Sequence, residues 1–259
     1  MPDESPRTMT TAETSWEVVD VLKEQNGARV SDVANELDLP KGTAYTHLAT
    51  LREKGKVVKN GHTYELSLQF LSIGEFVRNN DPLYIAGKEK VDRLAKETDE
   101  YVHLVTEDQY SPIYLYGASG EQAVGTKYFM QITQKTSYFH NTAYGKAILA
   151  HLPDNDVEEI LARDGLPSKT SNTITNREEL FDELELIRER GFALNDEEEL
   201  RGERAVGAPI LDKNDCIQGA VSITKPTSRM QDEEFYETIP RRVASTADAI
   251  AISLQTDQA

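Results

Sequence analysis

Uncharged polar side chains recur at helical spacing in one short segment, where they could hydrogen-bond to a nucleic acid. The polar residues stand at i, i+3, i+4 and i+7, and they are Thr43, Thr46, His47 and Thr50. Ala44, Leu48 and Leu51 have the spacing of a packed face on the other side of a helix predicted over about residues 43–54. Hydroxyl, methyl and imidazole groups suit contacts with base edges in the major groove of DNA. An ordinary core helix with a threonine-rich outer face is the alternative.

The charge around this helix favours the nucleic-acid interpretation. Over residues 41–62 there are five basic residues against Glu53 alone, a local balance of +4. The basic residues are Lys41, Arg52, Lys54, Lys56 and Lys59. We expect Lys41, Lys56, Lys59 and His62 to meet phosphates, which fix the position of a protein on DNA without reading its sequence. Arg52 is included among the candidate DNA contacts.

Two helices and a hairpin must position that surface. A first helix is predicted from Ser15 to the Asn26-Gly27 pair, with Trp16, Val18, Val19, Val21 and Leu22 on its packed side. Ser31 is expected to cap a second short helix, and it is included among the candidate DNA contacts. After the third helix, residues 56–59 and 63–66 are predicted strands joined by an Asn60-Gly61 turn. This order of elements predicts a winged helix-turn-helix.

The remainder of the chain predicts a mixed α+β domain behind a connecting helix. Helices are expected at 83–98, 143–151, 154–163, 176–190 and 232–254, and strands at 101–106, 112–116, 124–133 and 219–224. The predicted organisation is a flexible tail (1–12), a winged helix-turn-helix (13–66), a linker helix (67–80) and a C-terminal domain (81–255).

Around residue 142 the sequence offers a polar binding position. Thr142 is a good cap for a helix that begins at Ala143, and free N–H groups at a helix start attract an anion or a polar oxygen. Lys146 is more typical of a surface lysine than of a ligand contact. The run 196–199 contains four consecutive acidic residues, which is typical of a solvated turn, with a hard cation as the alternative.

Catalytic, metal and membrane signals are weak. Cys216 is the single cysteine and lies in an expected hairpin turn, and the histidines (47, 62, 103, 140 and 151) lack metal-ligand spacing. Phosphate-loop, dinucleotide and Gly-x-Ser-x-Gly motifs are absent from the sequence, so neither an enzyme nor a cofactor is predicted. The chain also lacks an apolar run of membrane-spanning length and an apolar signal core, so we expect a cytoplasmic protein.

Three segments in order resemble the IclR family of transcriptional regulators. The first is SWEVVDVLKEQNGARVSDVANELDLPKGTAYTHLATLREKGKVVKNGHTYELSLQFLSIG, from Ser15. HNTAYGKAILAHLP, from His140, is similar to the family's His-x-Thr-Ala-x-Gly-Lys-Ala signature. GFALNDEEELRGERAVGAPI, from Gly191, resembles its acidic segment with an Ala-Pro-Ile ending. The similarity covers about residues 15–254.

The resemblance implies a GAF- or profilin-like effector-binding domain behind the winged helix. It also implies a homodimer or dimer of dimers on a pseudo-palindromic operator, acting as a repressor or an activator under control of a small organic effector. Matched to the family, the effector-binding residues would be Ser137, Ala143, Tyr144, Asn195, Glu203, Ala205, Ser222 and Thr224. The expected effector is a sugar, sugar acid, keto acid or aromatic acid, although Glu203 would repel a carboxylate unless that side chain turns away or is protonated. A sensor or enzyme domain joined to an N-terminal protein-interaction module is the alternative.

The net charge of −17 over 259 residues at first argues against DNA binding. The acidity is uneven, since residues 1–70 hold 11 acids and 8 bases, whereas residues 71–259 hold 34 acids and 20 bases. Most of the excess therefore lies outside the predicted DNA-binding segment. We interpret it as adaptation to the salty cytoplasm of a halophilic archaeon, where a Debye length of about 3 Å at 1 M salt screens long-range repulsion.

Overall fold

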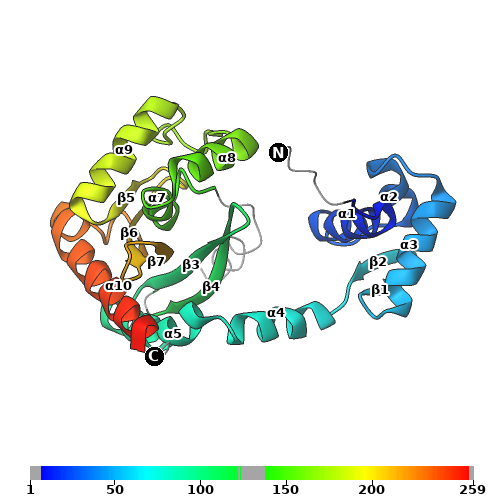
Figure 1. Ribbon diagram of the computed structural model, residues 1–259, viewed down its shortest axis with the longest axis horizontal. Coiled ribbons are helices and arrows are strands. Elements are labelled where there is room, and N and C mark those ends of the chain that lie inside the picture. The colour runs from blue at the N-terminus through cyan, green and yellow to red at the C-terminus, as the bar shows by residue number, and fades with distance from the viewer. Residues whose placement is uncertain (1–6, 122, 124–137, 257–259) are drawn as a thin grey trace. The chain divides into compact units, whose positions relative to one another are not determined.

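A computed structural model describes residues 7–121, 123 and 138–256, which belong to two compact units, Met1–Arg78 and Asn79–Ala259. Figure 1 labels their elements along the chain. The helices and strands of the first unit are α1 (Thr10–Glu24), α2 (Val30–Glu36), α3 (Lys41–Glu53), β1 (Val57–Asn60), β2 (Thr63–Leu66) and α4 (Gln69–Asn79).

The first unit is a winged helix-turn-helix, as the sequence predicts. Its core joins α1, α2 and α3 to the hairpin through buried apolar side chains, among them Val18, Leu22, Val33, Leu48 and Tyr64. The antiparallel β1–β2 hairpin is anchored to the helices where the backbone of Ala28 exchanges hydrogen bonds with that of Tyr64. The hairpin wing is therefore fixed beside α3.

Three local expectations in this unit are wrong. The first helix begins at Thr10, so the expected tail does not extend to residue 12. Trp16 is 61% exposed, because it lies on the outer side of α1 while Val18, Val19, Val21 and Leu22 fill the core. Ser31 is not the cap of α2, which begins at Val30, and its hydroxyl donates to Asp32 within the first turn.

The turn of the wing also differs from the expected one. Asn60 pairs with Thr63 as the last step of the ladder, so the two-residue loop is Gly61-His62 instead of Asn60-Gly61. Gly61 has φ +60°, a conformation that a residue without Cβ adopts freely. The Asn60 amide is engaged with Glu65 on the facing strand.

The predicted linker helix is α4, and none of its residues is buried. Several large apolar side chains are exposed along α4 and at the residue before it. They are Leu68, Leu71, Ile73, Phe76 and Val77.

The second unit is a mixed α+β domain, which confirms the predicted fold class. Its sheet has five antiparallel strands in the order β4-β3-β7-β6-β5. Its elements are α5 (Pro82–Thr98), β3 (Tyr101–Asp108), β4 (Ser111–Ser119), α7 (Ala143–Leu149), α8 (Asp154–Asp164), α9 (Arg177–Arg190), β5 (Ala193–Asp196), β6 (Glu203–Leu211), β7 (Ile217–Pro226), the π-helical turn η1 (Glu234–Thr238) and α10 (Ile239–Thr256).

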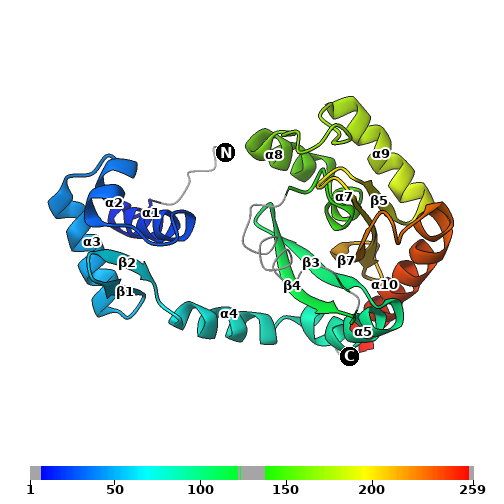
Figure 2. The same ribbon diagram turned by 180° about the vertical axis from the view of Figure 1, so that it is seen from behind.

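Helices cover the two faces of this sheet, as Figures 1 and 2 show. On one face Leu104, Val221 and Ile223 pack against α5 and α10. On the other face Val105 and Ala220 pack under α7, α8 and α9. We call this second side the α7 face, because α7 contacts β5, β6 and β7 directly.

Two strands and one break were not predicted. β5 and β6 flank the acidic run whose composition suggested only a turn, and the C-terminal helix is divided at the π-helical turn η1. The predicted strand at 124–133 lies outside the described residues. Within the described part of the chain, no helix is long and apolar enough to cross a bilayer.

Candidate functional site

The outer face of α3 carries exposed threonines, as the spacing predicts. Thr43, Thr46 and Thr50 are all exposed, while Ala44 and Leu48 on the opposite side are fully buried. The Thr46 hydroxyl donates to the carbonyl oxygen of Gly42 at 2.9 Å, and the Thr50 hydroxyl donates to that of Thr46 at 2.8 Å. The surface is therefore uncharged and partly apolar.

His47 and Tyr45 lie differently from the sequence expectation. The ring of His47 is half-buried, with its Nδ1 2.9 Å from the Ser15 hydroxyl of α1, so it packs between two helices. Tyr45, which was not among the candidates, is 54% exposed next to Thr46. It could have been found in the sequence by asking which positions lie away from Ala44 and Leu48 on the helix.

Exposed cations flank this face. Lys41 lies in the first turn of α3, Arg52 in its last turn, and Lys59 and His62 are exposed on the wing. The candidates Lys56 and Ser31 are half-buried. An uncharged helix face between exposed basic side chains suits a duplex whose phosphates lie on both sides of a groove.

The strand register places several predicted effector residues together on the α7 face. Asn195, Ala205 and Thr224 form one row across β5, β6 and β7, and Ser222 lies in the next row opposite Gly207. Ser222 is fully buried, and its hydroxyl has no hydrogen-bond partner among the described residues. Ser137 lies outside the described residues.

The N-terminus of α7 lies directly on β6. Thr142 caps the helix as predicted, since its hydroxyl accepts a hydrogen bond from the Gly145 amide at 3.2 Å. A Cβ at Gly207 would lie 2.6 Å from the carbonyl carbon and oxygen of Ala143 and 2.8 Å from the Tyr144 nitrogen. This close approach explains the glycine and places the buried residues Ala143 and Tyr144 over the sheet.

An aromatic group that the sequence did not single out lines the same face. Tyr101 and His103 pair with Thr224 and Ser222 on β7, and their rings stack with centroids 6.4 Å apart. Burial lowers the pKa of His103 to about 4, so this ring is neutral at pH 7. The Tyr-Val-His-Leu alternation could have assigned both rings to one face, but it could not have shown which strand they adjoin.

The aromatic rings on this face continue from His103 toward α7. The rings of Tyr114 and Tyr144 meet edge to face at a centroid distance of 5.3 Å, and the Tyr114 hydroxyl donates to the Tyr144 hydroxyl at 2.5 Å. The ring of Tyr114 also lies edge-on to His103. The α7 face therefore offers aromatic rings and hydroxyl groups in close proximity.

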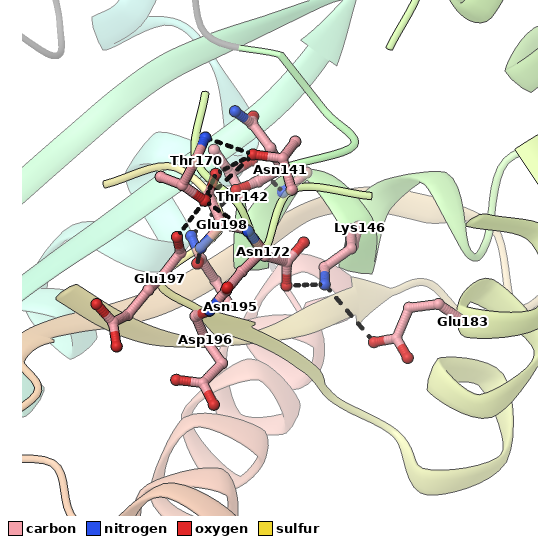
Figure 3. A network of polar contacts seen from close by, with 12 residues as sticks. Asn141, Thr142, Lys146, Thr170, Asn172, Glu183, Asn195, Asp196, Glu197 and Glu198 are labelled. Atoms are coloured by element: carbon pink, nitrogen blue, oxygen red, sulfur yellow. Dashed lines mark hydrogen bonds and ion pairs between the residues drawn. The ribbon is translucent and has the colours of Figure 1, made fainter. Parts of the chain in front are cut away.

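A buried ion pair joins α7 to the acidic segment. Figure 3 shows Lys146 between Glu198 and Glu183, with Nζ–oxygen distances of 2.5 and 3.7 Å. Lys146 is 1% exposed, so the expectation of a surface lysine is wrong, and so is that of a solvated turn for Glu198, which is 6% exposed. Burial raises the pKa of Glu198 above its ordinary value, and the nearby Lys146 charge offsets only part of this rise.

Hydrogen bonds hold the acidic segment in place. The Asn195 amide donates to the Asn141 carbonyl oxygen at 3.1 Å and accepts from the Glu198 backbone N–H at 2.8 Å (Figure 3). Thr170 donates to the Glu197 carbonyl oxygen and Asn172 to that of Asp196, at 2.7 and 3.0 Å. Asn195 thus connects the loop before α7 to the loop after β5.

Two further acids lie beside this loop. Glu203, at the start of β6, is buried. Burial and the nearby Glu203 charge raise the pKa of Glu199 to about 8, although Lys169 lowers it. At neutral pH, protonation of Glu199 therefore reduces the negative charge near the predicted effector residue Glu203.

The remaining candidates for catalysis or metal binding are His140, Cys216 and clusters of metal-ligating side chains. His140 is buried with its Nε2 3.2 Å from the Pro167 carbonyl oxygen, and burial lowers its pKa. Cys216 is exposed in the turn between β6 and β7. Among the described residues, no group of three or more His, Cys, Asp or Glu side chains is arranged to hold a metal ion.

Each of the two units matches a known protein family. Residues 15–61 match the IclR helix-turn-helix domain, and residues 77–252 match the family described as bacterial transcriptional regulator IclR C-terminal. A probable HTH-type transcriptional regulator ArcR from Halobacterium salinarum is 37% identical over 252 residues, covering 97% of this chain and 96% of that protein.

Solved structures show the same architecture. The Thermotoga maritima IclR structure is 30% identical with a TM-score of 0.70, and the match covers 95% of this chain and 99% of that one. An IclR homologue from Microbacterium hydrocarbonoxydans complexed with 4-hydroxybenzoate has a TM-score of 0.78 at 18% identity, covering 95% and 99% of the two chains. With a helix-turn-helix domain followed by an effector-binding domain, the chain belongs to the IclR family of transcriptional regulators.

Proposed function

We propose that this protein binds an operator through α3 and the wing, under the control of a small organic molecule bound on the α7 face. The observation that carries the DNA part is the exposed, uncharged threonine face of α3 between the exposed cations Lys41, Arg52 and Lys59. Base edges would meet the threonines, and the cations and His62 would meet phosphates. Lys56 would add a phosphate contact at the base of the wing, and Ser31 one beside α2. His47 would act mainly by fixing α3 against α1.

We assign DNA binding to residues 13–66, connection to residues 67–80 and effector binding to residues 81–255. Self-association is part of this proposal, as a homodimer or a dimer of dimers. The exposed apolar side chains Leu71, Phe76 and Val77 on α4 support it, because burial against a second copy would remove them from water. Two copies would place two recognition helices on a pseudo-palindrome, with half-sites about 34–36 Å apart or a multiple of this.

The effector site would comprise the α7 start and the facing strands. Its residues are Ser137, Ala143, Tyr144, Asn195, Glu203, Ala205, Ser222 and Thr224, to which we add Tyr101, His103 and Tyr114. Neutral rings and hydroxyls favour an aromatic acid or a hydroxylated compound such as a sugar or sugar acid over a small keto acid. The ligand of the Microbacterium homologue, 4-hydroxybenzoate, is a probe of the first kind.

The protein acts by binding alone in this proposal, without catalysing a reaction, and it does so in the cytoplasm. Effector binding would favour one of two arrangements of the linker helices and so change the affinity for the operator. The outcome would be repression or activation of transcription.

Selection from a randomised duplex DNA library tests the DNA part. The full-length protein should enrich one sequence, and hydroxyl-radical footprinting should locate it. Thr46→Ala/Thr50→Ala should need at least about 16-fold more protein for the same footprint, without a lower thermal midpoint of unfolding. Thr246→Ala is the matched control, because this threonine makes the same i−4 hydrogen bond on α10, 2.9 Å from the Arg242 carbonyl oxygen. Failure to enrich any sequence would favour an N-terminal protein-interaction module instead.

A thermal-shift screen tests the effector part. Probes are 4-hydroxybenzoate, gluconate, glucose and pyruvate, each over a concentration range, because a ligand at 100 times its Kd adds about 2.7 kcal/mol to stability. A bound probe should lose its shift in Ser222→Ala, while the exposed Ser245→Ala on α10 should keep it. A shift that survives Ser222→Ala and Tyr144→Phe unchanged would place the ligand elsewhere.

A further inference from the structure

The hydroxyl groups of Thr46 and Thr50 are both committed to the backbone of their own helix. Each donates its only hydrogen to the carbonyl oxygen four residues earlier, at 2.9 and 2.8 Å. A hydroxyl has one donor hydrogen, so neither side chain can donate to a base without breaking a bond inside α3. What remains for a partner on the outside is a γ-methyl group and an oxygen that can only accept.

The neighbouring residues keep this strip of α3 uncharged. Thr46 and Thr50 are one turn apart on the same side of the helix, and Ala49, half-buried beside them, adds another methyl group. Gly42, one turn before Thr46, has no side chain and nothing within 4 Å of the position of a Cβ. The middle of the recognition face is therefore a row of methyl groups that other atoms can approach closely.

Only one base presents a methyl group in the major groove. Thymine carries it at C5, and its partner adenine presents the N6 amino group, which donates hydrogen bonds. A methyl beside an acceptor-only oxygen complements both groups of an A·T pair. A G·C pair also presents a donor, the cytosine N4 amino group, so the acceptor oxygen alone does not distinguish the two pairs; the thymine methyl group, which a G·C pair lacks, does.

We propose that Thr46 and Thr50 read the operator through their γ-methyl groups, against thymine C5-methyl groups, so that each half-site has A·T pairs opposite this part of α3. The proposal rests on the proposed function, because it concerns the same recognition helix. It adds the base pairs that are read and the atoms that read them.

Substitutions that separate the methyl from the hydroxyl test the threonine side. Thr46→Val and Thr50→Val keep the methyl and lose the hydroxyl, while Thr46→Ser and Thr50→Ser do the reverse. On the selected duplex, the serine variants should lose affinity about fourfold for each methyl removed, and the valine variants should bind within about twofold of the parent. Thermal unfolding of each full-length variant checks the fold, and Thr246→Ser is the control.

Replacement of thymine by uracil tests the DNA side without changing the protein. Uracil keeps the base pairing and lacks the C5-methyl. The uracil duplex should bind the parent protein as weakly as the thymine duplex binds Thr46→Ser/Thr50→Ser, and that variant should not distinguish the two duplexes. A parent protein indifferent to uracil, or valine variants that fail where serine variants bind, would overturn the methyl readout. Either result leaves the operator enriched and the proposed function standing, whereas a library from which nothing is enriched contradicts both.

Discussion

Lys146 Nζ lies 2.5 Å from Glu198 Oε1, and both side chains are buried. The lysine belongs to α7 and the glutamate to the loop after β5, so the contact joins two segments 52 residues apart. It thereby connects the helix that covers the predicted effector residues to the loop that borders them.

Loss of the cation should be much more costly than loss of the whole pair. Lys146→Met leaves Glu198 buried without its partner, and the free energy of unfolding should fall by about 3–5 kcal/mol. Lys146→Met/Glu198→Leu should recover most of that loss. Urea unfolding followed by circular dichroism measures both. Lys88→Met, which breaks the partly exposed pair with Asp92, is the control, and an equal effect of the two lysine variants would refute a special role for the buried pair.

Contact between α7 and β6 should be sensitive to a single methyl group. Gly207→Ala places its Cβ within 2.8 Å of backbone atoms of Ala143 and Tyr144, so we expect a loss of about 1–3 kcal/mol in the free energy of unfolding. Gly74→Ala in α4 meets nothing within 4 Å and should be neutral or stabilise by up to about 1 kcal/mol. Equal stabilities of the two variants would contradict the close approach.

The folds of the two units could be predicted to different degrees from the sequence. In the first unit, helical spacing and the apolar set Val18, Leu22, Ala44 and Leu48 were sufficient, because the elements are local in sequence. In the second, β5 and β6 escaped prediction although each pairs with its neighbour in sequence, because the acidic loop between them obscures the strand pattern.

Acid should weaken the domain through His103. Its pKa is about 4 in the folded state against 6.5 ordinarily, so the unfolded state takes up the proton first. The free energy of unfolding should therefore fall as the pH drops from 6.5 toward 4, by up to about 3 kcal/mol from this residue. His103→Phe should reduce that fall, while His62→Gln on the exposed wing should not. Identical pH profiles for the parent and His103→Phe would contradict the assignment.

Alkali should lower the stability of the second unit through Glu199, whose pKa is raised to about 8. Because the folded state holds this proton more tightly, the stabilising contribution is complete below pH 4.5 and is lost as the pH rises toward 8. Glu199→Gln should thus gain more stability over the parent at pH 8 than at pH 5, in paired urea titrations. The exposed Glu185→Gln should show no such difference, and a gain independent of pH would rule out the titration of Glu199 as its cause.

The site was predictable where one residue type in one element was enough. The threonine spacing of α3 and the cap Thr142 are local features, and the structure has both. The inward turn of His47, the burial of Lys146 and the aromatic row at His103 depend on a second element supplying Ser15, Glu198 or β7. Partners from distant segments leave no mark in the spacing of a single sequence.

The central claim is that an acidic protein reads a specific DNA sequence through an uncharged helix face under high salt. Fluorescence anisotropy of the selected duplex, from 0.1 to 2 M KCl with excess competitor DNA, tests it most directly. Salt weakens the phosphate contacts of the cations, but it also screens the repulsion between DNA and the net charge of −17. Because the methyl readout is uncharged and the loss of repulsion offsets the lost phosphate contacts, we predict that affinity persists or rises across that range. A steep monotonic loss of affinity, as for a protein held mainly by phosphate contacts, would contradict the account.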